Sequence, residues 1–226
     1  MLAGNARYES TEDLPDIIPV FPLKAVILLP RGQLPLNIFE ERYLEMIDHA
    51  LRTDKVIGMI QPRFDKGEPD MSGNPPICDV GCAGRLTAYQ ETGDGRVLVT
   101  LTGIARFKVR EELDEGTDFR QCRINASPFD VDFIVGHEEG DVNRKSLLKT
   151  FRAYLDANSL EADWKSVEKA SNEVLVNALS MMSPYGPAEK QALLEAPDLK
   201  ARADTLIAIT EIELARSGGE GGSTLQ

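Results

Sequence analysis

The chain has 226 residues, of which 42% are hydrophobic and 27% are charged, a balance typical of a protein that buries a core. Its formal net charge of −12 repels polyanions, so we expect neither nucleic acid nor an anionic membrane as its usual partner. No apolar run is long enough to span a bilayer, and residues 1–15 lack the apolar centre of a secretory signal. These features predict a soluble, cytoplasmic protein of one domain or two closely packed parts.

Residues 1–16 are polar and show no hydrophobic period, so we expect a mobile N-terminal arm. From residue 17 to about residue 134, β-branched and aromatic residues stand between turn signals, which predicts strands. Prolines interrupt the first of these strands, and each removes a backbone donor, which favours a sheet edge or a bend. They are Pro19, Pro22, Pro30 and Pro35. We therefore expect a small, irregular β-barrel.

One helix is expected among the strands, over residues 37–53. Asn37 stands three residues before Glu40, which is the spacing of a helix N-cap and its reciprocal partner, and apolar residues follow at helical spacing. Phe39 is expected to pack inward near the start of this helix. Further along, Asp94-Gly95 lies between two alternating runs and predicts a β-hairpin.

The strand after this hairpin has two faces of different chemistry. Val99 and Phe107 share the apolar face, whereas Arg106, Lys108 and Arg110 share the other. We expect the first face to lie in the core and the second to face water.

After residue 141 the hydrophobic period becomes helical. In the second expected helix Ala170, Val174, Ala178 and Met182 recur on one face, and Gly186-Pro187 is typical of a helix start. The predicted organisation is an arm, a β-rich part, a helical bundle and a disordered Gly- and Ser-rich tail. Their respective bounds are 1–16, 17–141, 142–215 and 216–226.

The segment IIPVFPLKAVILLPRGQLPLNIFEERY, residues 17–43, resembles the start of the Lon N-terminal domain, the substrate-recognition part of ATP-dependent Lon proteases, which is also found in cereblon. Gly103, Arg106 and Phe107 are similar to the Gly-x-x-Arg-Phe signature of that family, and residues 177–179 and 189–195 resemble its helical half. The resemblance implies an α+β fold. It consists of an irregular β pseudo-barrel of the PUA-like type, with an inserted helix, packed against a C-terminal helical bundle.

Two motifs of the full Lon proteases are missing from the sequence. No Gly-Lys dipeptide is present to end a phosphate-binding loop, and no segment resembles the Pro-Lys-Asp-Gly-Pro-Ser-Ala-Gly run around the proteolytic serine. We therefore expect a stand-alone, non-catalytic recognition or adaptor domain without a cofactor. The resemblance implies that its partners are unfolded or partly folded polypeptides, together with a protease or a chaperone. No sequence signal predicts an oligomeric state.

Two clusters are candidate polypeptide-contact residues. Phe64 and Met71 lie in a long connection rich in proline and glycine, residues 62–76, where an aromatic ring and a thioether suit loose recognition of apolar segments. The second cluster follows a predicted helix and contains Met181, Met182 and Tyr185. The alternative for this second cluster is packing in the core.

Other functions remain as alternatives. A PUA-like barrel also suits an RNA-binding module, for which Arg85, Arg106, Lys108 and Arg110 form a basic stripe, unless they form an ordinary solvated face. Cys78, Cys82 and Cys122 offer three thiolates to zinc, or pack as reduced thiols. His49 and His137 have no partners at a spacing that indicates a catalytic triad.

Overall fold

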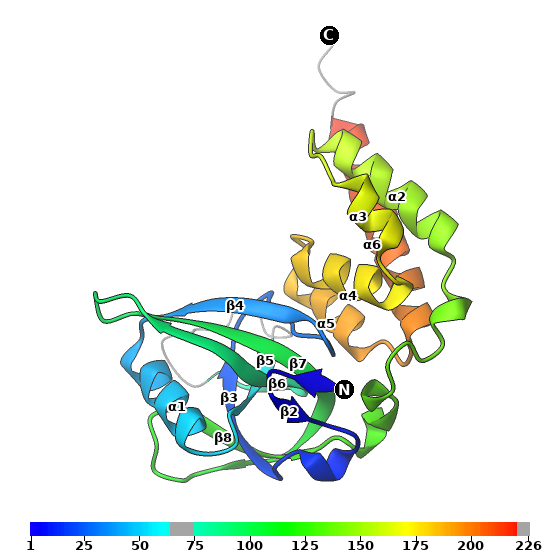
Figure 1. The fold of residues 1–226 in the computed structure, drawn as a ribbon. Coiled ribbons are helices and arrows are strands. Elements are labelled where there is room, and N and C mark those ends of the chain that lie inside the picture. The colour runs from blue at the N-terminus through cyan, green and yellow to red at the C-terminus, as the bar shows by residue number, and fades with distance from the viewer. Residues whose placement is uncertain (64–74, 221–226) are drawn as a thin grey trace. The chain divides into compact units, whose positions relative to one another are not determined.

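The structure is a computed structural model that describes residues 1–63 and 75–220, with side chains described as far as residue 216. The chain divides into two compact units (Figure 1). Unit 1 contains Met1–Val135 and Pro184–Leu194, and unit 2 contains Gly136–Ser183 and the chain from Glu195 onward. Unit 1 is mainly strands and unit 2 is entirely helical within these described ranges.

Unit 1 is built on a six-stranded sheet in the order β4-β7-β6-β5-β3-β8, in which β7 also pairs with β8. The pairing of β7 with β8 closes the sheet into a barrel, visible in Figure 1, as predicted from the prolines. Among the described residues, only the pairing of β3 with β5 is parallel. The strands are β3 (Ile17–Pro22), β4 (Gln33–Ile38), β5 (Val56–Pro62), β6 (Ile77–Glu91), β7 (Val97–Leu113) and β8 (Arg120–Asn125).

Gly103 of the Gly-x-x-Arg-Phe signature allows the chain before β4 to lie directly on β7. The amide of Arg31 donates to the carbonyl of Gly103 at 2.8 Å, and the amide of Gly103 donates to the carbonyl of Gly32 at 2.8 Å. A Cβ at position 103 would stand 2.1 Å from the carbonyl oxygen of Leu29, a distance that real Cβ atoms do not reach. The glycine is therefore required by a close backbone approach.

The first 16 residues differ from the expected arm. Strands β1 (Leu2–Ala3) and β2 (Ala6–Arg7) pair with each other, and a short 3-10 helix, η1 (Thr11–Asp13), follows. Ala3, Tyr8 and Leu14 are buried in the core cluster of unit 1. Their spacing matches neither a strand nor a helix period, so periodicity did not indicate this packing.

The inserted helix α1 (Glu41–Arg52) begins later than predicted. Asn37 is not its N-cap, because it lies in β4 opposite Leu98 of β7, and Glu40 holds the cap position. The prediction that Phe39 packs inward is also wrong, since its side chain is 63% exposed and the guanidinium of Arg96 lies 5.9 Å from the ring centroid. Pairing of β4 with β7 extends through Ile38 and delays the helix.

Helix α5 (Pro187–Glu195) starts at the predicted proline and, through its first two turns, joins unit 1. The side chain of Gln61 in β5 donates hydrogen bonds of 3.0 Å to the carbonyl of Pro187 and to the side chain of Gln191. Gln191 in turn donates to the carbonyl of Val80 in β6 at 3.1 Å. These buried amides attach the helix to two strands of the barrel.

Unit 2 contains the other predicted helices together with a short helix over Trp164–Lys169 that was not predicted. Capping side chains start two of them, since Asn143 accepts from the amide of Ser146 and Ser171 accepts from the amide of Val174. The last helix continues to residue 220, beyond the predicted end at 215, and residues 221–226 of the predicted tail lie outside the described residues. The helices are α2 (Arg144–Ala157), α3 (Trp164–Lys169), α4 (Asn172–Met182) and α6 (Leu199–Glu220), with α2 and α4 packed on α6.

Candidate polypeptide-binding surfaces

The five predicted contact residues have different environments. Phe64 and Met71 lie outside the described residues. Tyr185 is buried in unit 1, with only 7% of its surface exposed. Met181 is half-buried, whereas Met182 is 81% exposed, and both belong to unit 2. Of the cluster Met181, Met182 and Tyr185, Met182 therefore offers the largest exposed fraction to a partner.

Met182 continues an exposed apolar face of α4. Val174, Ala178 and Met182 follow one another at intervals of four residues and so share one side of the helix. Val174 is 55% exposed and Ala178 is half-buried. We call Val174, Ala178 and Met182 the α4 stripe, and it is a set of apolar side chains that a partner can cover without unfolding the helix.

The sequence prediction placed the residues of the α4 stripe on one helix face, and in the structure this face is the more exposed one. The buried face carries Leu175 and Val176 together with the polar residues Asn177 and Ser180. Asn177 is buried because its side-chain oxygen accepts a hydrogen bond of 3.0 Å from Arg202 of α6. Polar residues on the inner face concealed its apolar period, so the exposed face gave the stronger helical pattern.

The basic stripe that favoured RNA binding is not formed. Arg106 is 2% exposed, and its guanidinium bonds to the carboxylate of Asp132 in the 3-10 helix η2 (Ser127–Phe133). The prediction that Arg106 faces water was wrong, because η2 covers the outer side of β7 at this point. Lys108 and Arg110 are exposed. These two basic side chains, on a chain of net charge −12, do not favour binding of a polyanion.

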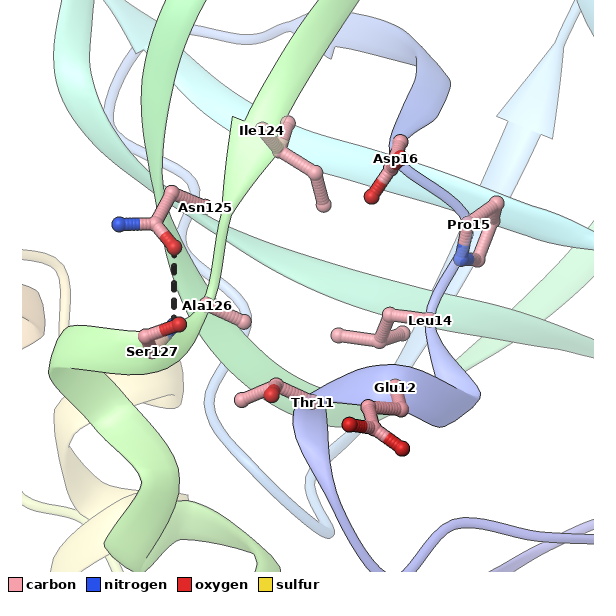
Figure 2. A pocket seen from close by; sticks show the side chains of 9 residues that line it. All are labelled: Thr11, Glu12, Leu14, Pro15, Asp16, Ile124, Asn125, Ala126 and Ser127. Carbon is pink, nitrogen blue, oxygen red and sulfur yellow. Dashed lines mark hydrogen bonds between the residues drawn. The ribbon is translucent and has the colours of Figure 1, made fainter.

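A pocket of about 350 Å³ opens in unit 1 where β3 and β8 separate. At this end of the two strands, the amide of Ile124 in β8 donates a hydrogen bond of 2.9 Å to the carbonyl of Asp16, the residue before β3. Beyond this bond the segment before β3 leads to η1 and the segment after β8 leads to η2, and a space lies between the two segments (Figure 2). The lining residues are Thr11, Glu12, Leu14, Pro15, Asp16, Ile124, Asn125, Ala126 and Ser127.

The pocket has an apolar floor and polar edges. Leu14, Ile124 and Ala126 are buried, and they belong to the core cluster of unit 1. Asn125 is already engaged, since its side-chain oxygen accepts from the amide of Ser127 at 3.2 Å. Sequence reasoning did not find this site, because its two sides come from segments far apart in the chain and neither carries a motif.

The three cysteines are all buried. Burial raises the pKa of the Cys122 thiol from 9.0 to about 11, so the thiol keeps its proton at neutral pH. Within the described ranges, no group of three His, Cys, Asp or Glu side chains is placed to hold a metal ion. The same ranges contain no helix with the length and the apolar character needed to cross a membrane.

A family model for the substrate-binding domain of the ATP-dependent protease La (LON) matches residues 17–211 of this sequence. The chain belongs to this family. The resemblance proposed from the proline-rich start and the Gly-x-x-Arg-Phe signature is thus confirmed.

Relatives in the Lon family are similar over most of this chain. It is 27% identical to Lon protease 2 of Myxococcus xanthus over 197 residues, and 24% identical to Lon protease of Escherichia coli (strain K12) over 203 residues. These matches cover 84% and 87% of this chain but 23% and 25% of the two relatives. The chain therefore spans about a quarter of the length of these curated Lon proteases.

Solved structures of the family share its fold. The N-terminal domain of the Mycobacterium avium complex Lon protease matches with a TM-score of 0.62 at 17% identity, over 86% of this chain and 98% of that one. A Lon N-terminal domain protein from Xanthomonas campestris matches with a TM-score of 0.57 at 21% identity, over 85% and 97% of the two chains. The predicted α+β fold is confirmed by these likenesses.

Proposed function

We propose that this chain recognises polypeptides and binds exposed apolar segments of unfolded or partly folded proteins through the α4 stripe. The match of residues 17–211 to the Lon substrate-binding domain carries the proposal. The α4 stripe supplies the surface, because Val174 and Met182 are 55% and 81% exposed apolar side chains on one helix face. A methionine thioether adapts to apolar segments of many shapes, which suits a surface for varied clients.

The proposed role is to hold a client without cleaving it. The similarity covers the substrate-binding domain of the Lon relatives, and delivery of a held client to a protease is part of this proposal. The net charge of −12 favours the solubility of a protein with an exposed apolar stripe. Affinity for one segment should be modest, because ordering the client offsets much of the free energy gained by burial.

Binding of a permanently unfolded probe, reduced and carboxymethylated α-lactalbumin carrying a fluorophore, tests the proposal by fluorescence anisotropy. Met182→Ser should weaken binding by roughly fivefold, because burial of a methionine side chain contributes on the order of 1–2 kcal/mol. Ile212→Ser is the matched control, since Ile212 is a 52% exposed apolar residue on α6 outside the α4 stripe. The control should bind like the original chain.

The same assay extends to the sequence-predicted loop, where Phe64→Ser with Met71→Ser is expected to weaken binding if both clusters hold the probe. A chain that does not bind the unfolded probe would refute the proposed function. Equal binding by Met182→Ser and Ile212→Ser would refute the α4 stripe as its surface.

A further inference from the structure

We infer that the pocket between η1 and the start of η2 receives a lysine or arginine side chain of a bound polypeptide. This inference rests on the proposed function and adds a chemical preference to it: clients with a basic residue are held more tightly. The pocket lies wholly within unit 1, and its volume of about 350 Å³ falls near the lower end for ligand sites, which suits one long side chain.

Two carboxylates give the pocket its charge. Glu12 and Asp16 are both exposed, and no basic residue is among the nine that line the pocket. Their neighbour Asp13 is differently placed, since its carboxylate accepts hydrogen bonds from the amides of Glu9 and Ser10, which lower its pKa. Neither Glu12 nor Asp16 has a side-chain hydrogen bond or an ion pair within the part of the chain that the structure describes.

The arrangement of apolar and acidic groups selects the ligand. In Figure 2 the side chains of Leu14 and Ile124 point into the same space, while Glu12 and Asp16 lie at opposite ends of it. A lysine or arginine has an aliphatic stem that packs on apolar surface and a charged head that stays near water. Such a side chain can lay its stem on the floor of the pocket and bring its head to the carboxylate at one end of it.

Other ligand classes fit the pocket less well. An anion would be repelled by both carboxylates, and a wholly apolar side chain would remove water from them without compensation. A divalent cation prefers six or more oxygen ligands, and the described residues contain no group of three acidic, His or Cys side chains placed for a metal. A basic side chain satisfies both the apolar floor and the acidic edges.

The test compares two peptides against two charge-matched variants. One peptide is an unstructured apolar sequence with a central arginine, and the other has citrulline, a neutral analogue of the same shape, in that place. In Glu12→Gln with Asp16→Asn, binding of the arginine peptide should weaken by about fivefold, as expected for the loss of one partly exposed ion pair. Binding of the citrulline peptide should not change, and 0.5 M salt should reduce the preference for arginine.

Asp114→Asn with Glu115→Gln is the matched control, because it removes two exposed carboxylates of unit 1 that do not line the pocket. It should leave the preference for arginine unchanged. An equal loss in both double variants would attribute the preference to net charge and overturn the inference. Equal binding of the two peptides to the original chain would also overturn it, while the proposed function would stand. Failure of both peptides and of the unfolded probe to bind would instead refute the proposed function.

Discussion

Arg106 and Asp132 form a buried, two-point ion pair that attaches η2 to β7. Nε and Nη2 of Arg106 donate to the two carboxylate oxygens of Asp132 at 2.9 and 2.8 Å, with side chains 2% and 7% exposed. The amide of Arg106 also donates to Asp132, and its Nη1 donates to the carbonyl of Leu194 at 3.2 Å. The ring of Phe129 lies 4.6 Å from the guanidinium carbon. The arginine of the family signature therefore holds three segments of unit 1 together.

Removal of one member of this pair should strongly destabilise unit 1. Asp132→Ala leaves a buried guanidinium without its counter-charge, which costs about 3–5 kcal/mol of unfolding free energy. Urea unfolding followed by circular dichroism measures the loss. Asp79→Ala is the control, because Asp79 pairs with Arg63 on the surface, where their side chains are 76% and 47% exposed. The control should cost less than about 1 kcal/mol.

The double variant Arg106→Met with Asp132→Leu separates charge from packing. It removes both charges and keeps apolar volume, so it should lose less stability than Asp132→Ala alone. A double variant as unstable as Asp132→Ala would show that the hydrogen bonds, and not the uncompensated charge, dominate at this site.

Gly103→Ala should destabilise the barrel by about 3 kcal/mol or more, because the new Cβ would stand 2.1 Å from the backbone oxygen of Leu29. The backbone carbonyl of Leu29, which accepts a hydrogen bond of 2.9 Å from the amide of Gly32, cannot move aside as a flexible side chain does. Gly140→Ala provides the comparison, since a Cβ there meets no atom within 4 Å. It should change the stability by less than about 0.5 kcal/mol. Similar midpoints in urea for the two variants would contradict the proposed close approach.

The Cys122 thiol should be unreactive in the folded protein. Its raised pKa of about 11 and its full burial leave little thiolate at pH 8, so a thiol reagent such as dithiobisnitrobenzoate should react far more slowly than in urea. Between pH 9.0 and about 11 the unfolded thiol loses its proton while the folded thiol keeps it, so this group makes the fold less stable as pH rises.

Cys122→Ala should remove that part of the pH dependence, which urea unfolding at pH 8 and pH 10.5 can measure. An unfolding free energy that falls equally in the variant and in the original chain would assign the pH effect to other groups.

Several elements could be predicted from sequence because their signals are local. Pro187 fixes a backbone angle suited to the first turn of a helix, and α5 does begin there. The turn around Asp94-Gly95 does join β6 to β7, although the positive φ angles are at Gly93 and Gly95. By contrast, the inner face of α4 gave no apolar period, because it includes the polar Asn177, which accepts a hydrogen bond from Arg202 of another helix.

For the candidate sites too, local features could be predicted from the sequence, whereas exposure and neighbours could not. Met182 was found as an apolar residue at a helix end, and its 81% exposure could be known only after the helices packed. The sequence did not indicate Glu12 and Asp16 as site residues, because an acidic residue becomes a candidate for binding a basic side chain only when apolar surface lies beside it. That floor is partly built by Ile124 and Ala126 of a distant segment.

The sequence by itself determined that Arg106 and Phe107 face opposite sides of β7, because successive side chains of a strand point to opposite faces. An irregularity in the pairing with β6 between Ala83 and Gly84 breaks this alternation earlier in the strand. The side chains of Arg106 and Phe107 do lie on opposite faces of the strand. Only the tertiary structure decided that both faces are buried there, with Phe107 inside the barrel cluster and Arg106 under η2. Alternation is a property of the local backbone, whereas burial depends on which distant segment covers each face, and here Asp132 supplies the charge that makes covering an arginine possible.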